Sequence, residues 1–274
     1  MAQAPVPARF IVRTYGEFGP QVILLHGGPG AAGYMAPVAR ELSDAFHVIE
    51  PFQRRSENDS LTVQRHIDDL DDVVREYCTE EQPAIVGHSW GAMLALAYAA
   101  QHADVARCIV LIGCGTFDQG ARYHLQSTLV ERTTPQLTCR LGRLSREIAD
   151  PDVRLCVYSR LLEPLYIYDA LQDETHETEE YDHKGHDESW RDMLRLQACG
   201  VYPETLVRVR TPLLMIHGDW DPHPGQSTLK TLVPYLPQIE YAELTNCGHY
   251  PWRERHTRGR FYDHVRAWLG MYMT

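Results

Sequence analysis

Short apolar runs alternate along this chain with longer stretches in which apolar residues recur every three or four positions. Apolar runs of about four to eight residues predict strands, and the longer periodic stretches predict helices. The expected strands are Phe10–Tyr15, Gln21–Leu25, Phe46–Glu50, Ala84–Gly87, Cys108–Gly113, Pro212–His217 and Glu240–Leu244. The expected helices are Met35–Phe46, Leu61–Cys78, Gly91–Gln101, Gln226–Tyr235 and Arg258–Met271. This order is typical of an α/β fold, in which helices cover both faces of a mostly parallel sheet.

The alternation breaks between Thr116 and Thr205, where short helical patterns replace strands and charged residues crowd together. Strand order resumes at Thr211. An inserted helical segment therefore explains the break better than a second independent domain does. We predict an α/β core domain over residues 1–115 and 206–274, and a helical cap, or lid, over residues 116–205.

Acidic residues and histidines gather inside this predicted cap, in the stretch from Asp173 to Glu188. The stretch holds eight acids, three histidines and one lysine. A rim that recognises cations and a weak metal site are both conceivable, but the composition favours a solvated, mobile loop. We therefore predict no metal site.

The overall charge limits the classes of partner. The chain has 274 residues and a formal net charge of -11, which disfavours nucleic acid and anionic membranes as partners. No apolar run is long enough to span a bilayer, and the first residues lack the basic and apolar regions of a secretion signal. Seven cysteines lie scattered without the spacing of a metal site. We expect a cytoplasmic protein with reduced cysteines, either a monomer or a homodimer.

The stretch Ile85–Gly91 carries the strongest chemical signal in the chain. It is an apolar strand that leads into Gly-His-Ser-Trp-Gly, and a helical run of small and apolar residues follows at once. Glycines on both sides of Ser89 allow a sharp turn from strand to helix, with the serine hydroxyl raised above the sheet. This sequence therefore predicts that Ser89 is a nucleophile.

A second glycine-rich turn, His26-Gly-Gly-Pro-Gly30, follows an earlier strand. Glycines there allow a backbone N–H to face a ligand, which suits one half of an oxyanion hole. We expect the N–H of Gly28 to be one donor and that of Trp90, the residue after the nucleophile, to be the other. The glycine order typical of dinucleotide binding is absent.

The base and the acid are expected after two later strands. His249 follows the last strand and is the candidate general base, and a carboxylate at the end of the preceding strand would orient its imidazole. By chemistry alone, either Asp219 or Asp221 could do so. His26 and His88 stand close to these turns, but we interpret them as packing and hydrogen-bonding residues.

These motifs, with Ser89 before His249 in the chain, closely resemble those of the α/β-hydrolase superfamily. The pair His-Gly-Gly-Pro-Gly and Gly-His-Ser-Trp-Gly is most similar to the motifs of its proline-iminopeptidase-like branch. The resemblance implies an eight-stranded, mostly parallel sheet with a helical lid and no cofactor. It also implies that Asp221 is the acid of the triad, and that Gly28 and Trp90 are the oxyanion donors. A serine at position 89 disfavours the reactions of the epoxide-hydrolase and dehalogenase branches, which carry an acid there.

The chain departs from that branch where a peptide substrate would bind. A glycine that usually follows Gln53 and Arg54 is missing, and Pro222 occupies a position where some aminopeptidase relatives carry an acid for the terminal amine. Three acids of the predicted cap could substitute for it: Glu163, Glu174 and Glu179. We therefore expect a serine hydrolase of small-molecule carboxylic esters or lactones. The alternatives are an aminopeptidase acting on short peptides and a catalytically slow ligand sensor.

Overall fold

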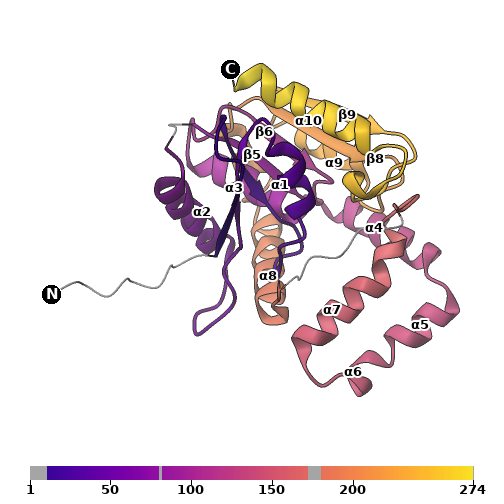
Figure 1. Cartoon of the computed structure of the whole chain (residues 1–274). Coiled ribbons are helices and arrows are strands. Elements are labelled where there is room, and N and C mark those ends of the chain that lie inside the picture. Colours follow the sequence, from indigo (N-terminus) through magenta and orange to yellow (C-terminus); the bar gives the residue numbers. More distant parts are fainter. Residues whose placement is uncertain (1–10, 80–81, 172–179, 274) are drawn as a thin grey trace.

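The computed structural model describes residues 11–79, 82–171 and 180–273. Its main sheet has the strand order β1-β4-β2-β5-β6-β8-β9, and only the pair β1 and β4 is antiparallel. The strands are β1 (Val12–Tyr15), β2 (Gln21–Leu25), β4 (His47–Pro51), β5 (Ala84–His88), β6 (Ile109–Ile112), β8 (Leu213–Gly218) and β9 (Ile239–Leu244). Each falls on one of the predicted apolar runs, so the predicted α/β class is confirmed (Figure 1).

The number of strands differs from the expectation. Within the described residues the main sheet has seven strands, whereas the family resemblance implied eight. The eighth strand had no counterpart among the apolar runs of this chain, so the hydrophobic pattern was the better guide. Every residue of β2, β5, β6 and β8 is buried, as expected for the centre of a parallel sheet.

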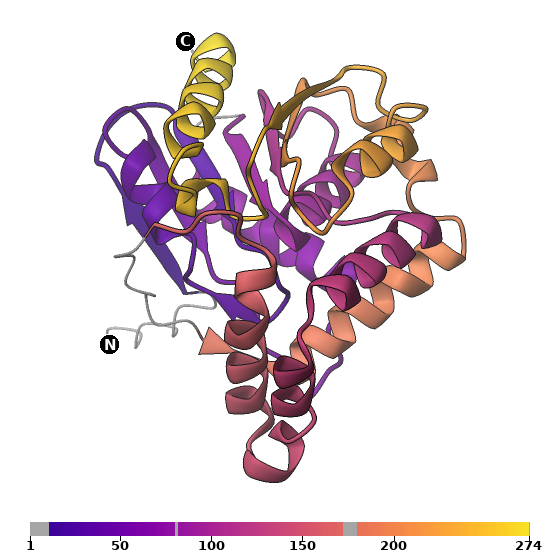
Figure 2. The same ribbon diagram turned by 90° about the vertical axis from the view of Figure 1, so that its right-hand side faces the viewer.

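Helices cover both faces of this sheet, as predicted. They are α1 (Ala36–Leu42), α2 (Val63–Tyr77), α3 (Trp90–Gln101), α9 (Gly225–Leu232) and α10 (Arg258–Tyr272). Adjacent strand residues point to opposite faces, so Ile85 packs in the layer of α2, α3 and α9, and Val86 packs in the layer of α1 and α10. Figure 2 shows α10 (yellow) and α9 (orange) on opposite sides of the sheet.

The chain between β6 and β8 is mostly helical. It contains α4 (Gln119–Arg132), α5 (Pro135–Leu141), α6 (Leu144–Glu147), α7 (Pro151–Leu162), η1 (Glu163–Leu165), β7 (Glu180–Tyr181), α8 (His183–Ala198) and η2 (Glu204–Arg208). We call residues 116–205 the cap segment. Its helices α5, α6 and α7 project away from the sheet (Figures 1 and 2). The short strand β3 (Ala31–Ala32), beside the second glycine turn, pairs with β7 and so joins the cap segment to the core.

The interpretation of Asp173–Glu188 as a solvated loop is wrong for its second half. Residues 172–179 lie outside the described part of the chain, but β7 and the first turns of α8 follow them. Asp182 is buried and caps α8 by accepting a hydrogen bond from the N–H of Gly185 at 3.0 Å. Its carboxylate also accepts from the N–H of Ser56. The acid is needed as a helix cap, which a count of charges does not reveal.

All seven cysteines are free thiols, and Cys108, Cys114 and Cys247 are buried. Among the helices of the described residues, none combines the length and the apolar character that a membrane span requires.

Candidate active site

Ser89 lies at the sharp turn between β5 and α3. Its backbone is strained, with φ 54° and ψ -115°, and its N–H donates to the carbonyl oxygen of Ile112 at 2.8 Å. The two flanking glycines are required by close packing. A Cβ on Gly87 would lie 2.4 Å from the carbonyl oxygen of Gly91, and a Cβ on Gly91 would lie 2.5 Å from that of Leu25. The turn is therefore locked by backbone contacts, with Ser89 at its apex.

A cavity of about 360 Å³ opens above this turn. Ser89, Gly28 and His249 border it on the core side. Side chains of the cap segment form much of the remaining wall, including Leu129, Leu155, Tyr158, Leu162, Tyr166 and Trp190. The cavity has the size and the mixed apolar and polar lining of a site for a small molecule.

The glycine turn after β2 packs directly against the nucleophile. A Cβ on Gly27 would lie 2.7 Å from the Cβ of Ser89, and the N–H of Gly27 donates to the hydroxyl of Tyr34 at 2.6 Å. In the described part of the chain, the backbone N–H groups of Gly28 and Trp90 have no acceptor. Two unused donors at the turn and at the start of α3 could together stabilise an oxyanion beside Ser89.

The structure distinguishes between the two candidate acids. Asp221 is buried, and its Oδ2 accepts a hydrogen bond from His249 Nδ1 at 2.7 Å. Asp219 is exposed and instead accepts from the N–H of Cys247 at 3.3 Å. Gly113 makes room for the pair, since its φ is +51° and a Cβ there would lie 2.9 Å from His249 Nδ1.

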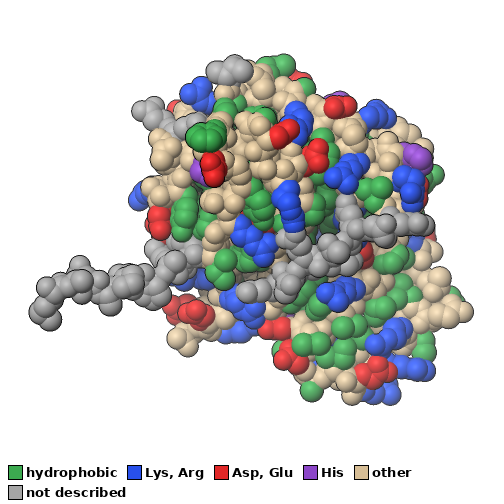
Figure 3. Space-filling view, viewed as in Figure 1, with side chains coloured by type: hydrophobic (Ala, Val, Ile, Leu, Met, Phe, Trp, Pro, Cys, Tyr) green, Lys and Arg blue, Asp and Glu red, His purple; other side chains and the backbone are tan. Residues whose placement is uncertain are grey.

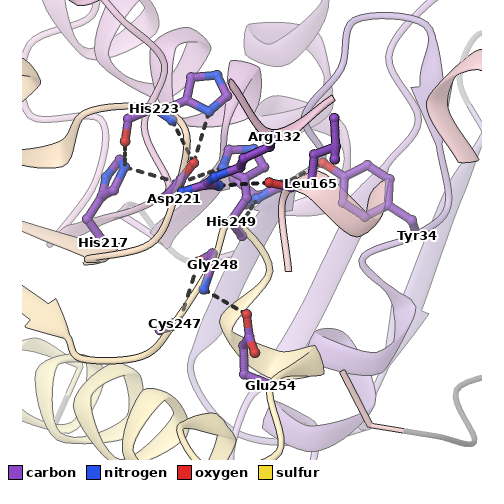
Figure 4. Close-up of polar contacts among 11 residues, drawn as sticks. Tyr34, Arg132, Leu165, His217, Asp221, His223, Cys247, Gly248, His249 and Glu254 are labelled. Carbon is purple, nitrogen blue, oxygen red and sulfur yellow. Dashed lines mark hydrogen bonds and ion pairs between the residues drawn. The ribbon is translucent and has the colours of Figure 1, made fainter. Parts of the chain in front are cut away.

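Asp221 is surrounded by two further histidines, which the sequence interpretation missed (Figure 4). His217 Nε2 lies 3.1 Å from Oδ2, and the N–H and Nδ1 of His223 lie 2.9 and 3.1 Å from Oδ1. The ring of His223 stacks on that of His249 with centroids 4.5 Å apart. Burial alone would raise the pKa of Asp221, but the imidazoles outweigh it and hold the pKa well below its usual range. The carboxylate thus stays ionised.

These groups also provide the only set of possible metal ligands found among the described residues. Suitable atoms of Asp221, His223 and His249 lie within 4.8 Å of one another. Their hydrogen bonds to one another already use the Nδ1 atoms and both carboxylate oxygens. A metal ion could bind them only by replacing those hydrogen bonds.

His249 and Ser89 border the same cavity, but they are not hydrogen-bonded to each other. Within the described residues, neither the Ser89 hydroxyl nor His249 Nε2 has a hydrogen-bond partner. Such contacts are often long in an enzyme without substrate and shorten when the substrate binds. Burial lowers the pKa of His249 despite the opposing effect of Asp221, so its imidazole is neutral and can accept a proton near neutral pH.

His88 and His26 have the supporting roles that the sequence interpretation gave them. His88 Nε2 lies 2.9 Å from the carbonyl oxygen of His249, and its Nδ1 lies 2.6 Å from the Tyr34 hydroxyl. His26 lies between the carbonyl oxygen of Gly27 at 2.9 Å and the N–H of Gln53 at 3.1 Å. Burial lowers the pKa of both histidines, that of His26 to about 4, so both remain neutral structural groups.

Glu254 is another residue that sequence reasoning missed, because an acid in a charged loop carries no distinguishing signal. It is buried, and its carboxylate accepts from the N–H groups of Gly248, Tyr168 and Asp169 at 2.7 to 2.8 Å. The N–H of His249 donates in addition to the carbonyl oxygen of Tyr166. The histidine loop is thereby fastened to the cap segment.

Comparison with known proteins finds a matching family model and two partial relatives. The model of the alpha/beta hydrolase family matches residues 22–259. A cis-3-alkyl-4-alkyloxetan-2-one decarboxylase from Shewanella oneidensis is 27% identical over 107 residues, which are 36% of this chain and 34% of that protein. The probable aminopeptidase YbaC from Bacillus subtilis is 29% identical over 99 residues, which are 31% of each chain. These matches thus span about a third of each curated relative.

A solved structure extends the likeness over nearly the whole chain. A thermophilic esterase from Thermogutta terrifontis has a TM-score of 0.65 and is 19% identical, and the match covers 97% of this chain and 94% of the esterase. At this level of identity the likeness shows a shared fold.

Proposed function

The chain belongs to the alpha/beta hydrolase family, and on that premise we propose that it is a serine hydrolase acting on small-molecule carboxylic esters or lactones. Ser89 is the proposed nucleophile, His249 the base and Asp221 the acid that orients it. The Asp221–His249 hydrogen bond of 2.7 Å, beside the cavity that Ser89 also borders, is the observation that carries the proposal. An esterase and a protein named for an oxetan-2-one, which is a cyclic ester, are among its relatives.

In the proposed reaction, Ser89 Oγ attacks the substrate carbonyl carbon while its proton moves to His249 Nε2. The carbonyl oxygen becomes an oxyanion and accepts hydrogen bonds from the N–H groups of Gly28 and Trp90. The tetrahedral intermediate collapses, the C–O bond breaks, and His249 gives its proton to the departing alkoxide. Water then attacks the acyl-enzyme and loses a proton to His249, and release of the acid restores the Ser89 hydroxyl. Asp221 stabilises the imidazolium throughout.

The substitution Ser89→Ala tests this proposal. We expect the turnover of p-nitrophenyl butyrate to fall by about four orders of magnitude or more, because the nucleophile is removed. The melting temperature should stay at the wild-type value or rise, since alanine removes only a hydroxyl that has no partner among the described residues. Ser145→Ala, on the exposed surface of α6, is the matched control and should leave turnover unchanged. Wild-type turnover in Ser89→Ala would remove Ser89 from the mechanism.

Aminopeptidase activity is the second candidate, because YbaC carries that name and Glu163 borders the cavity. A carboxylate that binds a substrate's terminal amine has to be available, but Glu163 accepts a hydrogen bond from Arg253 at 2.8 Å. Glu174 and Glu179 lie outside the described residues. We therefore rank this candidate below ester hydrolysis. Faster cleavage of proline p-nitroanilide than of p-nitrophenyl esters, with no cleavage of the N-blocked anilide, would reverse the order.

A ligand sensor that turns over very slowly is the third candidate. It predicts tight binding of a small molecule with no acyl-enzyme, so failure of a reactive phosphonate to label Ser89 would favour it.

We also propose that the protein is cytoplasmic, which cell fractionation of the producing organism would test.

A further inference from the structure

Three side chains with fixed charge border the active-site cavity within the described residues: Arg160, Glu163 and Arg253. Two are positive and one is negative, so the cavity wall carries an excess of one positive charge. The chain as a whole has a formal net charge of -11. A positive side chain at the cavity of an acidic protein is a local feature that favours an anionic group on the substrate.

Glu163 and Arg253 neutralise each other. Arg253 donates to the Glu163 carboxylate at 2.8 Å, and both side chains are mostly buried, with 17% and 23% of the side-chain surface of Arg253 and Glu163 exposed. The guanidinium of Arg253 also lies 5.6 Å from the centre of the Tyr250 ring. This ion pair forms a fixed part of the cavity wall. The positive charge of Arg160 is the one that the pair does not neutralise.

Arg160 is the unpaired charge of this wall, as far as the described residues show. It lies in the last turn of α7, and within the described residues its guanidinium has no hydrogen bond and no ion pair. Arginine carries five N–H donors in a planar arrangement that matches a carboxylate, and it stays charged at any physiological pH. Most other arginines of the cap segment donate to an acceptor in the protein. Arg132, for example, donates to the carbonyl oxygen of Leu165, and Arg154 donates to that of Ile148.

Arg160 is exposed, and it lies where α7 borders the cavity. Arg160 and Glu163 are three residues apart, so they lie on the same face at the end of the helix. Glu163 contacts Arg253, which follows shortly after His249 in the chain. The end of α7 that carries Arg160 therefore lies near the histidine loop.

We propose that Arg160 is a specificity-determining residue that binds a free carboxylate on the substrate. The preferred substrates are then esters or lactones whose acyl or alcohol part carries a second, ionised carboxyl group, such as half-esters of dicarboxylic acids. The carboxylate forms a paired hydrogen bond with the guanidinium, while the scissile carbonyl lies at Ser89. This inference rests on the proposed hydrolase function and names its substrate class.

The test uses two esters of equal length that differ in charge. Mono-p-nitrophenyl glutarate carries a carboxylate, and p-nitrophenyl pentanoate has a methyl group in its place. For the wild type we expect a higher kcat/KM on the anionic ester. In Arg160→Gln, kcat/KM on the anionic ester should fall by roughly 10- to 100-fold, mostly through KM, because a charge-assisted bidentate contact is lost. The value for the neutral ester should change by less than about threefold.

Arg146→Gln is the matched control. Arg146 is also an exposed cap arginine without a partner in the described residues, but it does not border the cavity. It should leave the ratio of the two rates unchanged. Arg160→Glu should lower the rate on the anionic ester further. Equal rates on both esters in the wild type, or an equal fall on both in Arg160→Gln, would overturn the assignment.

A binding measurement separates this inference from the proposed reaction. In a Ser89→Ala background, calorimetry with glutaric acid monoamide and with uncharged pentanamide compares the two charges without turnover. If the monoamide binds more tightly than pentanamide, and Arg160→Gln abolishes this difference, the result supports the carboxylate subsite even if neither ester is hydrolysed. Equal binding of both amides contradicts it even if both esters are hydrolysed through Ser89.

Discussion

The α/β core and the cap segment hold their side chains very differently. Every residue of α3 except its last is buried, whereas α5 and α7 contribute no buried residue. Figure 3 shows hydrophobic side chains mixed with charged ones on the lobe at the lower right, where Figure 1 places α5, α6 and α7. Val153 of α7 is 51% exposed.

This difference assigns separate tasks to the two regions. The reacting groups lie on core turns where neighbouring atoms leave no room for a larger residue: backbone atoms at Gly87, and the side chains of His249 and Asp221 at Gly113. The walls that a substrate would contact come largely from loosely packed cap helices. Chemistry should therefore be sensitive to small changes in the core, and substrate choice should be adjustable in the cap.

The largest expected difference between the core and the cap segment is in the loss of stability when one side chain is shortened in each. Leu96 of α3 is fully buried, and Val130 of α4 is 74% exposed. Leu96→Ala should lower the free energy of unfolding by roughly 2 to 5 kcal/mol through lost burial and a residual cavity. Val130→Ala should change it by less than about 0.5 kcal/mol. Urea denaturation with matched m-values measures both, and equal losses would erase the distinction.

Buried ionisable groups make the core sensitive to pH. Glu50 of β4 is fully buried, one of its oxygens accepts from the Tyr15 hydroxyl at 2.9 Å, and the other has no partner in the part of the chain that the structure describes. Burial raises the pKa of Glu50 from 4.5 to about 7. The contribution of Glu50 to folding stability is therefore complete below pH 4.5 and is lost as the pH rises through 7. The free energy of unfolding changes by on the order of 3 kcal/mol over this range.

Glu50→Gln should remove that loss, so the variant should gain stability over the wild type as the pH rises from 4.5 to 8. The difference between the two proteins isolates Glu50 from buried histidines such as His26, whose pKa is lowered to about 4 and whose contribution is lost as the pH falls below 6.5. Glu131→Gln, on the exposed surface of α4, should show no such trend. Parallel curves for wild type and Glu50→Gln would contradict the account.

Adding one methyl group beside the triad tests how tightly the core holds it. In Gly113→Ala, the new Cβ would press on His249 Nδ1 and on the Asp221 carboxylate at 3.3 Å, from a backbone conformation that alanine disfavours. We expect kcat/KM to fall about 100-fold, because small displacements of reacting groups are costly. Gly142→Ala in the cap segment, where φ is -64°, should leave kcat/KM at its wild-type value. An active Gly113→Ala enzyme would show that the triad tolerates displacement.

The pH dependence of activity should give the smallest shift. Because burial lowers the pKa of His249, the acid limb of kcat/KM should have its midpoint below 6.5 and reach a plateau by neutral pH. His124→Ala, an exposed histidine of the cap segment, should not move that limb. A midpoint above 7 would mean that another group controls proton transfer.

The same contrast explains what could be predicted from the sequence. Core strands such as Ala84–His88 are continuous apolar runs, and the glycines around Ser89 mark a turn that other residues could not form. The local pattern left both Asp219 and Asp221 open, because both follow the same strand, and only the family resemblance favoured Asp221.

Less could be predicted for the cap segment and the supporting residues. Tyr158, Tyr166 and Trp190 border the cavity, although no sequence motif marks them as part of the site. Tyr123 of the cap segment is 71% exposed, which its aromatic side chain does not indicate. Glu254 accepts from the N–H groups of Tyr168 and Asp169, and His223 stacks on His249, so both residues act through contacts that local sequence does not reveal.

Mapping the site of covalent labelling tests the central claim most directly, namely that Ser89 is a nucleophile activated by His249. The protein is treated with a fluorophosphonate, and peptide mass spectrometry locates the adduct. We predict one adduct per chain, on Ser89, formed at least about 100-fold more slowly in His249→Ala because the base is missing. An adduct on a different residue, in a protein that still hydrolyses p-nitrophenyl butyrate, would contradict the account.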